Sequence, residues 1–293
     1  MKVDNAIIMA AGMSTRFVPI SYETHKAMVK VKNEVLIERQ IKQLIEKDIK
    51  DIYVVTGYKS EQFEYLKDLF NVRLIYNKEY SYRNNNSSIW ASKDILSNSF
   101  VCSSDNYFSI NPFDNEITES YYAALYSEGK TNEWCITEDK DGYIDSVTIG
   151  GSKSWYMMGH TFWSESFSRK FIDILSKEYN LSGTQNKLWE AIYLEHLDIL
   201  KMKIKKYHNN DIYEFDSIDD LRKFDYDYIT DTGSSILKDI SSRLSVAEKD
   251  ICCFKPLFDT DNSLKGFEFN VKSEIYNYDF INQSLSKGEK LYV

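Results

Sequence analysis

The amino-acid sequence predicts an α/β fold with a central mixed, mostly parallel sheet that is flanked by helices. Short apolar runs of strand length alternate with segments that carry apolar residues at helical spacing. Strands separated by such helices are typical of βαβ units, in which consecutive strands lie parallel. The length of 293 residues is enough for one large domain with a small appendage.

The elements of the N-terminal part follow one another as strand and helix. The apolar run 6–9 is too short for a buried helix and is expected to be a strand, and 52–56 is rich in β-branched residues. Segments 36–46 and 61–70 each place their apolar side chains on one helical face. Further strands are expected at 72–76 and 100–104, with a helix between them at 88–96.

From residue 121 onward the pattern changes to that of a partly antiparallel section. Strands are expected at 134–137, 144–149, 155–163 and 213–215, and helices at 167–179 and 187–198. Another helix is expected to begin at Asp216-Ser217, because a capping residue is followed by Asp219 and Asp220 in the first turn.

The pattern changes again near residue 231, which divides the chain into a main domain at 1–230 and a C-terminal appendage at 231–293. The appendage is expected to contain a helix at 234–244 and strands at 266–271 and 291–293.

Composition excludes several classes of protein. The net charge of −9 disfavours broad binding to nucleic acid or to anionic membranes, which both rely on a basic surface. No apolar run approaches the roughly 20 residues that span a bilayer, and no secretory signal is expected. The 4 cysteines have neither metal-ligand spacing nor a disulfide pattern. Free thiols in a reducing cytoplasm are therefore expected.

The first expected strand is followed by a loop that has almost no side chains. Ala10, Ala11 and Gly12 leave backbone N–H groups open to a ligand, and such groups bind base edges or phosphate oxygens. Arg16 and Lys26 then supply positive charge that suits a polyphosphate. The alternative is an ordinary strand-to-turn junction with two solvated cations.

Several segments resemble, in order and content, the motifs of the sugar-nucleotide-type nucleotidyltransferases. They are the loop 10–16 with His25-Lys26-Ala27, and then 54–58, 84–88, 104–107, 131–134 and 214–217. The set is most similar to the bacterial CTP:phosphocholine cytidylyltransferase family and covers about residues 1–230. The resemblance implies a Rossmann-like nucleotidyltransferase fold and transfer of CMP from CTP to phosphocholine, which yields CDP-choline and pyrophosphate.

The resemblance also implies roles for four charged residues. Asp105 and Asp216 would hold Mg²⁺, which prefers carboxylate and phosphate oxygens. Lys26 would bridge the α-phosphate and the attacking phosphate, and Arg16 would contact the β- and γ-phosphates. A turn aspartate and a helix N-cap are the alternative roles of the two carboxylates. The family commonly has proline at the position of His25, so we assign this histidine no direct role.

Nucleotide contacts are implied for small and polar residues of the matching segments. The set is Ala10, Ala11, Gly12, Thr56, Gly57, Tyr58, Asn85, Ser88 and Ser104. Within it, Asn85 and Ser88 are candidates for contacts to the cytosine or the ribose. Capping of the helix that is expected near Ser88 is the alternative role for both side chains.

A quaternary ammonium group is recognised by aromatic faces, often with a carboxylate nearby. The aromatic candidates are Tyr107, Trp134, Trp163 and Trp189, and Glu190 is the candidate carboxylate. The chain has 22 Tyr and 16 Phe, so a place in the core is the alternative for each aromatic candidate.

We therefore expect a cytoplasmic, Mg²⁺-dependent cytidylyltransferase that uses phosphocholine. Alternatives of the same class use 2-aminoethylphosphonate, phosphoethanolamine or a sugar 1-phosphate. A non-catalytic nucleotide-binding regulator is the alternative of a different class. Such a protein would be expected to lose Arg16, Lys26, Asp105 or Asp216, and all four are present.

Residues 251–269 faintly resemble the opening of a choline-kinase-type phosphotransferase, but no segment resembles a kinase catalytic loop, so no kinase activity is expected. Three roles are open for the appendage: packing on the main domain, support of a homodimer, or a remnant of a larger ancestor. All candidate catalytic residues precede it. Truncation after about residue 230 is therefore expected to leave measurable cytidylyl transfer.

Overall fold

The computed structural model describes residues 1–288, which pack as two compact units. The first unit combines Met1–Gly12 with Leu36–Glu214, and the second combines Met13–Val35 with the chain from Phe215 onward. The domain boundary expected near residue 230 thus falls inside the second unit. The strand expected at 291–293 lies outside the described residues. Within residues 1–288, no helix is both long and apolar enough to cross a membrane.

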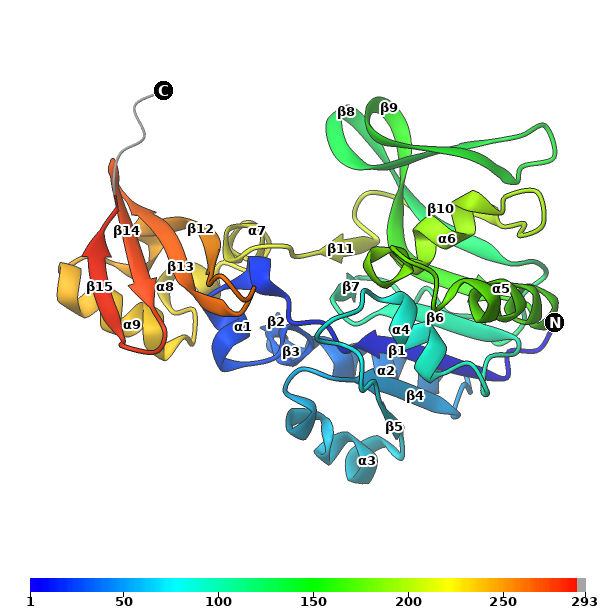
Figure 1. Cartoon of the computed structure of the whole chain (residues 1–293), viewed down its shortest axis with the longest axis horizontal. Coiled ribbons are helices and arrows are strands. Elements are labelled where there is room, and N and C mark those ends of the chain that lie inside the picture. Colours follow the sequence, from blue (N-terminus) through cyan, green and yellow to red (C-terminus); the bar gives the residue numbers. More distant parts are fainter. Residues whose placement is uncertain (289–293) are drawn as a thin grey trace. The chain divides into compact units, whose positions relative to one another are not determined.

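The first unit is built on a mixed sheet of seven strands (Figure 1). In spatial order these are β10 (Lys203–Lys206), β8 (Tyr121–Glu138), β9 (Ile144–Trp163), β6 (Ser99–Ser103), β1 (Asn5–Ala10), β4 (Ile52–Thr56) and β5 (Arg73–Tyr76). β1 pairs in parallel with both β4 and β6, and β5 extends the parallel set. β9 runs antiparallel to β6 and β8. The prediction of a mixed, mostly parallel sheet is confirmed.

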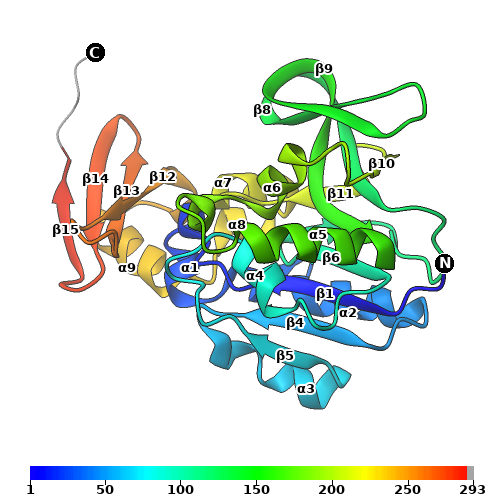
Figure 2. The same cartoon turned by 45° about the vertical axis from the view of Figure 1, so that its right-hand side comes forward.

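Helices pack on this sheet through apolar faces that the sequence pattern indicates. They are α2 (Leu36–Glu46), α3 (Tyr65–Phe70), α4 (Asn86–Ala91), α5 (Glu165–Glu178) and α6 (Trp189–Glu195), with the short 3₁₀ turns η3 (Ser60–Phe63) and η4 (Thr184–Asn186). α4, α5 and α6 share one apolar cluster with the sheet, centred on Trp163, Phe171 and Trp189. Figure 2 shows α5 lying along the sheet. A separate ribbon pairs β7 (Asn106–Phe108) with β11 (Ile212–Glu214).

Several elements of the first unit differ from the prediction. β7 and β10 were not expected, and the helix expected at 88–96 is α4, Asn86–Ala91. The helix expected at 61–70 is divided into η3 and α3. The three strands expected between 134 and 163 belong to only two strands, β8 and β9, of 18 and 20 residues. The interval expected between strands 144–149 and 155–163 lies within β9, where Gly151 pairs with Thr131 of β8 and the ladder continues through several register shifts.

The second unit joins an N-terminal segment to the C-terminal part of the chain. The segment Met13–Val35 forms η1 (Thr15–Phe17), α1 (Ile20–Glu23), η2 (Lys26–Met28) and the hairpin of β2 (Lys30–Val31) and β3 (Glu34–Val35). The C-terminal part has the helical elements α7 (Ile218–Phe224), α8 (Asp227–Thr230), α9 (Ser235–Leu244) and η5 (Glu248–Asp250). An antiparallel sheet follows, with β12 (Ile251–Phe258), β13 (Leu264–Val271), β14 (Glu274–Asp279) and β15 (Ser284–Lys287).

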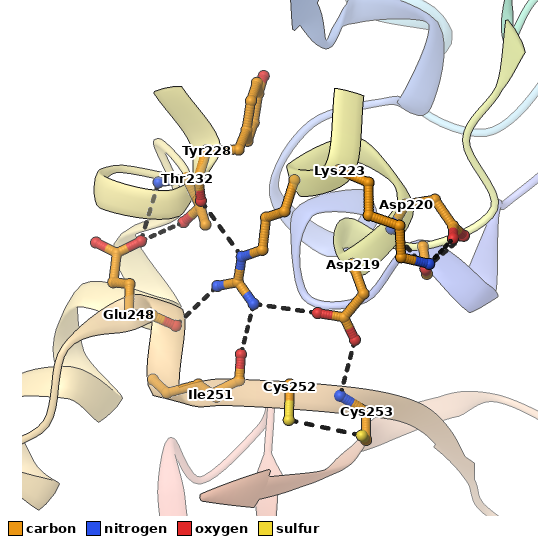
Figure 3. Close-up of polar contacts among 11 residues, drawn as sticks. Asp219, Asp220, Lys223, Tyr228, Thr232, Glu248, Ile251, Cys252 and Cys253 are labelled. Atoms are coloured by element: carbon orange, nitrogen blue, oxygen red, sulfur yellow. Dashed lines mark hydrogen bonds and ion pairs between the residues drawn. The ribbon is translucent and has the colours of Figure 1, made fainter. Parts of the chain in front are cut away.

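The buried side chain of Arg222 ties α7 to the chain that leads into β12, and its partners Asp219, Glu248 and Ile251 are labelled in Figure 3. Its guanidinium donates to the carbonyl oxygens of Glu248 at 2.7 Å and Ile251 at 2.6 Å. Asp219, one turn earlier on α7, accepts from Arg222 at 3.2 Å and from the backbone N–H of Cys253 at 2.9 Å. Buried carbonyl groups need donors and a buried charge needs a partner, and this cluster supplies both.

Candidate functional site

The loop after β1 is fixed by the turn that follows β4. The backbone N–H of Tyr58 donates to the carbonyl oxygen of Ala11 at 3.1 Å. Gly57 makes this approach possible, because a Cβ there would lie 2.6 Å from the ring of Tyr80 and 2.8 Å from the carbonyl oxygen of Ala11. The two segments that the sequence assigned to nucleotide binding thus lie side by side within the first unit.

Gly12 differs from Gly57 in its surroundings. It is exposed, and a Cβ added to it would meet no protein atom within 4 Å. The packing of the protein itself therefore does not require glycine at this position. The loop keeps an open, side-chain-free surface, which suits close approach of a ligand to the backbone.

Thr56 and Ser88 belong to one buried polar network. The carbonyl oxygen of Thr56 accepts from the N–H of Asn77 at 2.8 Å. The side-chain amide of Asn77 donates to the hydroxyl oxygens of Ser87 at 2.8 Å and Ser88 at 3.3 Å. The Ser88 hydroxyl is thus held inside the protein in this structure, and its expected contact with the nucleotide stays a prediction.

Asn85 and Glu190 form a second network, to which Tyr122 adds a donor. The amide oxygen of Asn85 accepts from the N–H of Trp189 at 2.7 Å, and its amide nitrogen donates to Glu190 at 3.0 Å. The hydroxyl of Tyr122 donates to the other carboxylate oxygen of Glu190 at 3.2 Å. Asn85 thereby caps the first turn of α6. Its side chain makes no capping hydrogen bond to α4, the helix near Ser88 for which the sequence suggested a cap.

Burial sets the protonation of Glu190. It raises the pKa of this carboxyl to about 7, although the donors Asn85 and Tyr122 act in the opposite direction. Burial also raises the pKa of the Tyr122 hydroxyl well above its ordinary value. Tyr122 therefore stays a neutral donor near neutral pH, while Glu190 titrates there.

The aromatic candidates fall into two groups. Trp163 and Trp189 are 0% and 1% exposed and pack with their ring centroids 4.9 Å apart. We correct their assignment to an open aromatic box, since side chains buried in the core offer no free face to a ligand. Trp134 is half-buried on β8 and packs at the edge of the same apolar cluster.

Ser104, Asp105 and Tyr107 lie where β6 passes into β7. Ser104 and Asp105 form the turn between the two strands, and Tyr107 is a residue of β7. The guanidinium of Arg39 lies 4.6 Å from the centre of the Tyr107 ring. One face of this ring thus already binds a cation of the protein itself, which argues against a place for Tyr107 in an aromatic box for substrate.

In the second unit, two cations meet one carboxylate. Arg16 donates to Asp216 at 2.8 Å, and the ammonium nitrogen of Lys26 lies 3.6 Å from the other oxygen of the same carboxylate. The Lys26 side chain is 5% exposed, whereas that of Arg16 is 73% exposed. The imidazole Nδ1 of His25 accepts from the N–H of Ala27 at 3.1 Å and so caps the turn that carries Lys26.

Asp216 precedes the helix start that the sequence predicted. The N-cap of α7 is Ser217, whose hydroxyl oxygen accepts from the N–H of Asp220 at 3.2 Å. The capping role left open for Asp216 is therefore filled by its neighbour, and the Asp216 carboxylate faces Arg16 and Lys26 instead.

The oxygen donors of Asp105 and Asp216 fit a hard divalent cation chemically. Among residues 1–288, no group of three or more His, Cys, Asp or Glu side chains could hold a metal ion. Mg²⁺ usually takes only one or two carboxylates from the protein and completes its shell with substrate phosphates and water. Each of these carboxylates, taken by itself, is a ligand type that suits an ion bound together with a nucleotide.

Two participants in these networks were missed by sequence reasoning. Tyr122 lies 68 positions from Glu190, and Asn77 lies outside every matching motif. Nothing in the local sequence distinguishes either residue from an ordinary strand or loop residue. Only the folded sheet and its helices bring Tyr122 of β8 to Glu190 of α6, and Asn77, which follows β5, to Ser88 of α4.

Comparison with known proteins identifies clear relatives. The Nucleotidyl transferase family matches residues 5–133. The choline-phosphate cytidylyltransferase of Streptococcus pneumoniae is 36% identical over 220 residues, which cover 75% of this chain and 96% of that protein. The 2-aminoethylphosphonate cytidylyltransferase of Lancefieldella rimae is 32% identical over 229 residues, or 77% and 93% of the two chains. The solved structure of the CTP:phosphocholine cytidylyltransferase from Streptococcus pneumoniae superposes with a TM-score of 0.73 and covers 76% of this chain and 97% of that chain.

The contrast between Gly57 and Gly12 predicts different effects of a single methyl group. Gly57→Ala should lower the free energy of unfolding by about 1–3 kcal/mol, because its Cβ would overlap the Tyr80 ring and a backbone oxygen. Gly12→Ala is the matched control and should change stability by less than about 0.5 kcal/mol. Chemical denaturation of both variants measures the difference. Equal stabilities would contradict the close packing of the two loops.

The raised pKa of Glu190 predicts a pH-dependent stability. Folding raises this pKa from 4.5 to about 7, so the stabilising contribution is complete below pH 4.5 and is lost as the pH rises through about 7. Between these limits the free energy of unfolding should fall by about 1–3 kcal/mol because of this group. Glu190→Gln cannot ionise and should show a flatter profile in denaturation experiments at pH 5 to 8. Parallel profiles of variant and wild type would refute the assignment.

Proposed function

This chain belongs to the family of nucleotidyltransferases that includes the bacterial choline-phosphate cytidylyltransferases, and on that premise we propose that it transfers CMP from CTP to phosphocholine. The products are CDP-choline and pyrophosphate. The observation that carries the proposal is the convergence of Arg16 and the buried Lys26 on the carboxylate of Asp216. Two cations that bind one carboxylate can also bind the phosphate groups of two substrates.

The reaction needs little covalent chemistry from the protein. A phosphate oxygen of phosphocholine attacks the α-phosphorus of CTP, and the bond from that phosphorus to the bridging oxygen of the β-phosphate breaks. Pyrophosphate leaves with the electron pair of that bond. Catalysis then depends on holding two anions together and on neutralising the charge that moves between their oxygens.

Lys26 and Arg16 have different parts in this proposal. The Lys26 ammonium is held on a buried stem, so its position is fixed before substrate binds. Fixed charge stabilises a transition state because no reorganisation is needed at the moment of reaction. The exposed Arg16 side chain is suited to bind and release the β- and γ-phosphates.

Asp105 and Asp216 are the residues that we propose to hold Mg²⁺. When bound, this ion supplies neutralisation of phosphate charge and favours the in-line geometry. Within the second unit, Asp216 also holds Arg16 and Lys26 on one carboxylate. The open loop at Gly12 is proposed to receive the nucleotide through its backbone N–H groups.

For the amine, we propose Trp134 as the aromatic face and Glu190 as the carboxylate. Trp134 is the one tryptophan of the candidate set that keeps exposed surface. Glu190 can become an anion near neutral pH, which favours a cationic ligand nearby. All 4 cysteines are free, which agrees with a reducing compartment, and we therefore place the reaction in the cytoplasm.

A second candidate substrate is 2-aminoethylphosphonate. It is favoured by the 32% identity to the cytidylyltransferase named for that compound. The Glu190 carboxylate could accept hydrogen bonds from its primary ammonium, which a trimethylated ammonium cannot donate. The proposed amine site therefore favours phosphocholine if it presents ring faces to the ammonium group. It favours 2-aminoethylphosphonate if it presents hydrogen-bond acceptors.

The role of Lys26 predicts a large kinetic effect at one lysine and none at its neighbour. Lys26→Ala should lower kcat/KM by about a hundredfold or more, because the lost charge acts on the transition state. Lys30→Ala is the matched control, since Lys30 is exposed and lies on the same segment. Steady-state measurement of pyrophosphate release gives both values. Normal turnover in Lys26→Ala would show that this lysine has no catalytic role.

The substrate assignment is tested by assay with CTP and each of phosphocholine, phosphoethanolamine and 2-aminoethylphosphonate. Phosphocholine should be preferred by about tenfold to a hundredfold in kcat/KM, because a primary ammonium loses water at an aromatic face without gaining partners. Trp134→Ala should raise the KM for phosphocholine and leave that for CTP unchanged. Trp155→Ala, on the adjacent strand, is the control. Preference for 2-aminoethylphosphonate would select the second candidate, and no turnover of any amine would reject both.

A further inference from the structure

The segment that carries Arg16 and Lys26 packs with the C-terminal part of the chain. Met13–Val35 belongs to the second unit, together with α9 and the four-stranded sheet. About a quarter of this chain lies outside its match to the choline-phosphate cytidylyltransferase, which covers 75% of it. The contacts made by α1 indicate what the C-terminal part of this chain does.

Glu23, the last residue of α1, binds the N-terminus of α9. One of its carboxylate oxygens accepts from the backbone N–H groups of Ser235 at 2.8 Å and Ile236 at 3.3 Å, and from the hydroxyl of Ser235. The α9 helix also has its own cap, because the hydroxyl oxygen of Ser234 accepts from the N–H of Leu237 at 3.1 Å. Glu23 thus supplies the negative charge that the first turn of a helix favours.

Tyr22 makes a second contact, with the C-terminal sheet. Its ring is stacked on that of Phe280 with a centroid distance of 3.8 Å and an interplanar angle of 3°. Phe280 is 5% exposed, and its ring lies 5.6 Å from that of Phe267 in the core of this sheet. The stack therefore fixes α1 to a rigid part of the second unit rather than to a loose terminus.

The position of α1 in the chain gives these contacts a functional consequence. α1 lies between η1, which contains Arg16, and η2, which begins at Lys26. Both cations reach Asp216, which directly precedes the capped start of α7. A shift of α1 would therefore move both cations relative to their common partner.

We infer that Tyr22 and Glu23 are positioning residues, through which α9 and the C-terminal sheet hold Arg16 and Lys26 in place for nucleotidyl transfer. The inference rests on the proposed function of these two cations. It replaces the expectation that the chain truncated after residue 230 stays active, because truncation would remove both partners of α1. A displacement of the order of 1 Å at a catalytic group can cost about a hundredfold in rate.

The test compares point variants of the full chain. Glu23→Ala and Tyr22→Ala each remove one contact of α1. Tyr22→Phe keeps the stacked ring and should restore wild-type behaviour. Asp239→Ala is the matched control for Glu23, because Asp239 lies on α9, the helix that Glu23 contacts, and pairs instead with Arg243 of that helix at 3.0 Å. Glu23→Gln, which keeps an acceptor oxygen without the charge, serves as the milder variant if Glu23→Ala does not fold.

Two measurements are made on folded protein, well below the unfolding transition of every variant. Amide hydrogen exchange of residues 13–35 should become faster in Glu23→Ala and Tyr22→Ala. In the same variants kcat/KM for cytidylyl transfer should fall about tenfold to a hundredfold, mainly through kcat. Tyr22→Phe and Asp239→Ala should match the wild type in both respects. A purely structural role would lower the melting temperature and leave kcat of the folded protein unchanged.

Unchanged exchange of residues 13–35 in both alanine variants would overturn the inference, and so would faster exchange with unchanged kcat/KM. If the wild type turns over none of the phosphorylated amines, the proposed function fails separately. Calorimetric titration with CTP then replaces the rate as the readout. Weaker CTP binding in Glu23→Ala than in Asp239→Ala would support the positioning role, and equal affinities would reject it.

Discussion

The buried guanidinium of Arg222 is the interaction on which the second unit depends. It satisfies the carbonyl oxygens of Glu248 and Ile251 at the point where the helices give way to β12 (Figure 3). Its own charge is balanced by Asp219, which also holds the N–H of Cys253. Removal of one partner from such a cluster leaves another group buried without compensation, and this is costly. The start of α7 and the start of the C-terminal sheet are therefore fixed together.

This anchoring extends to the charged residues of the site. Asp216 immediately precedes the N-cap of α7, so the helix that Arg222 anchors also fixes the carboxylate that binds Arg16 and Lys26. On the other side, α1 places both cations and is bound by Glu23 and Tyr22 to α9 and Phe280. The carboxylate of Asp216 and the two cations that bind it are thus both held by the C-terminal part of the chain. The C-terminal chain, which the change of sequence pattern near residue 231 marks as an appendage, becomes part of the scaffold of the cation cluster.

The first unit organises its polar residues differently. Ser88, Asn85 and Glu190 are held by hydrogen bonds within the protein, from Asn77 and Tyr122 and to the N–H of Trp189. Some elements of this unit were predictable from the sequence, since α2 and β4 were expected with the bounds that they have. The hydrogen-bond partners of Asn85 and Glu190 were not, because Trp189 and Tyr122 lie 104 and 68 positions away from them in the chain. Trp163 and Trp189 illustrate the same limit, since nothing in the sequence distinguishes a buried indole from an exposed one.

The sequence by itself determined the parallel strand–helix alternation, the side-chain-free loop at Gly12, and the identity and order of the charged residues. These are local properties, set by apolar periodicity, backbone freedom and residue type. Only the tertiary structure decided which aromatic side chains are buried, and that Ser217 rather than Asp216 caps α7. It also decided that Met13–Val35 packs with the C-terminal chain. The physical reason is that burial and pairing are relations between residues distant in sequence, which no local pattern encodes.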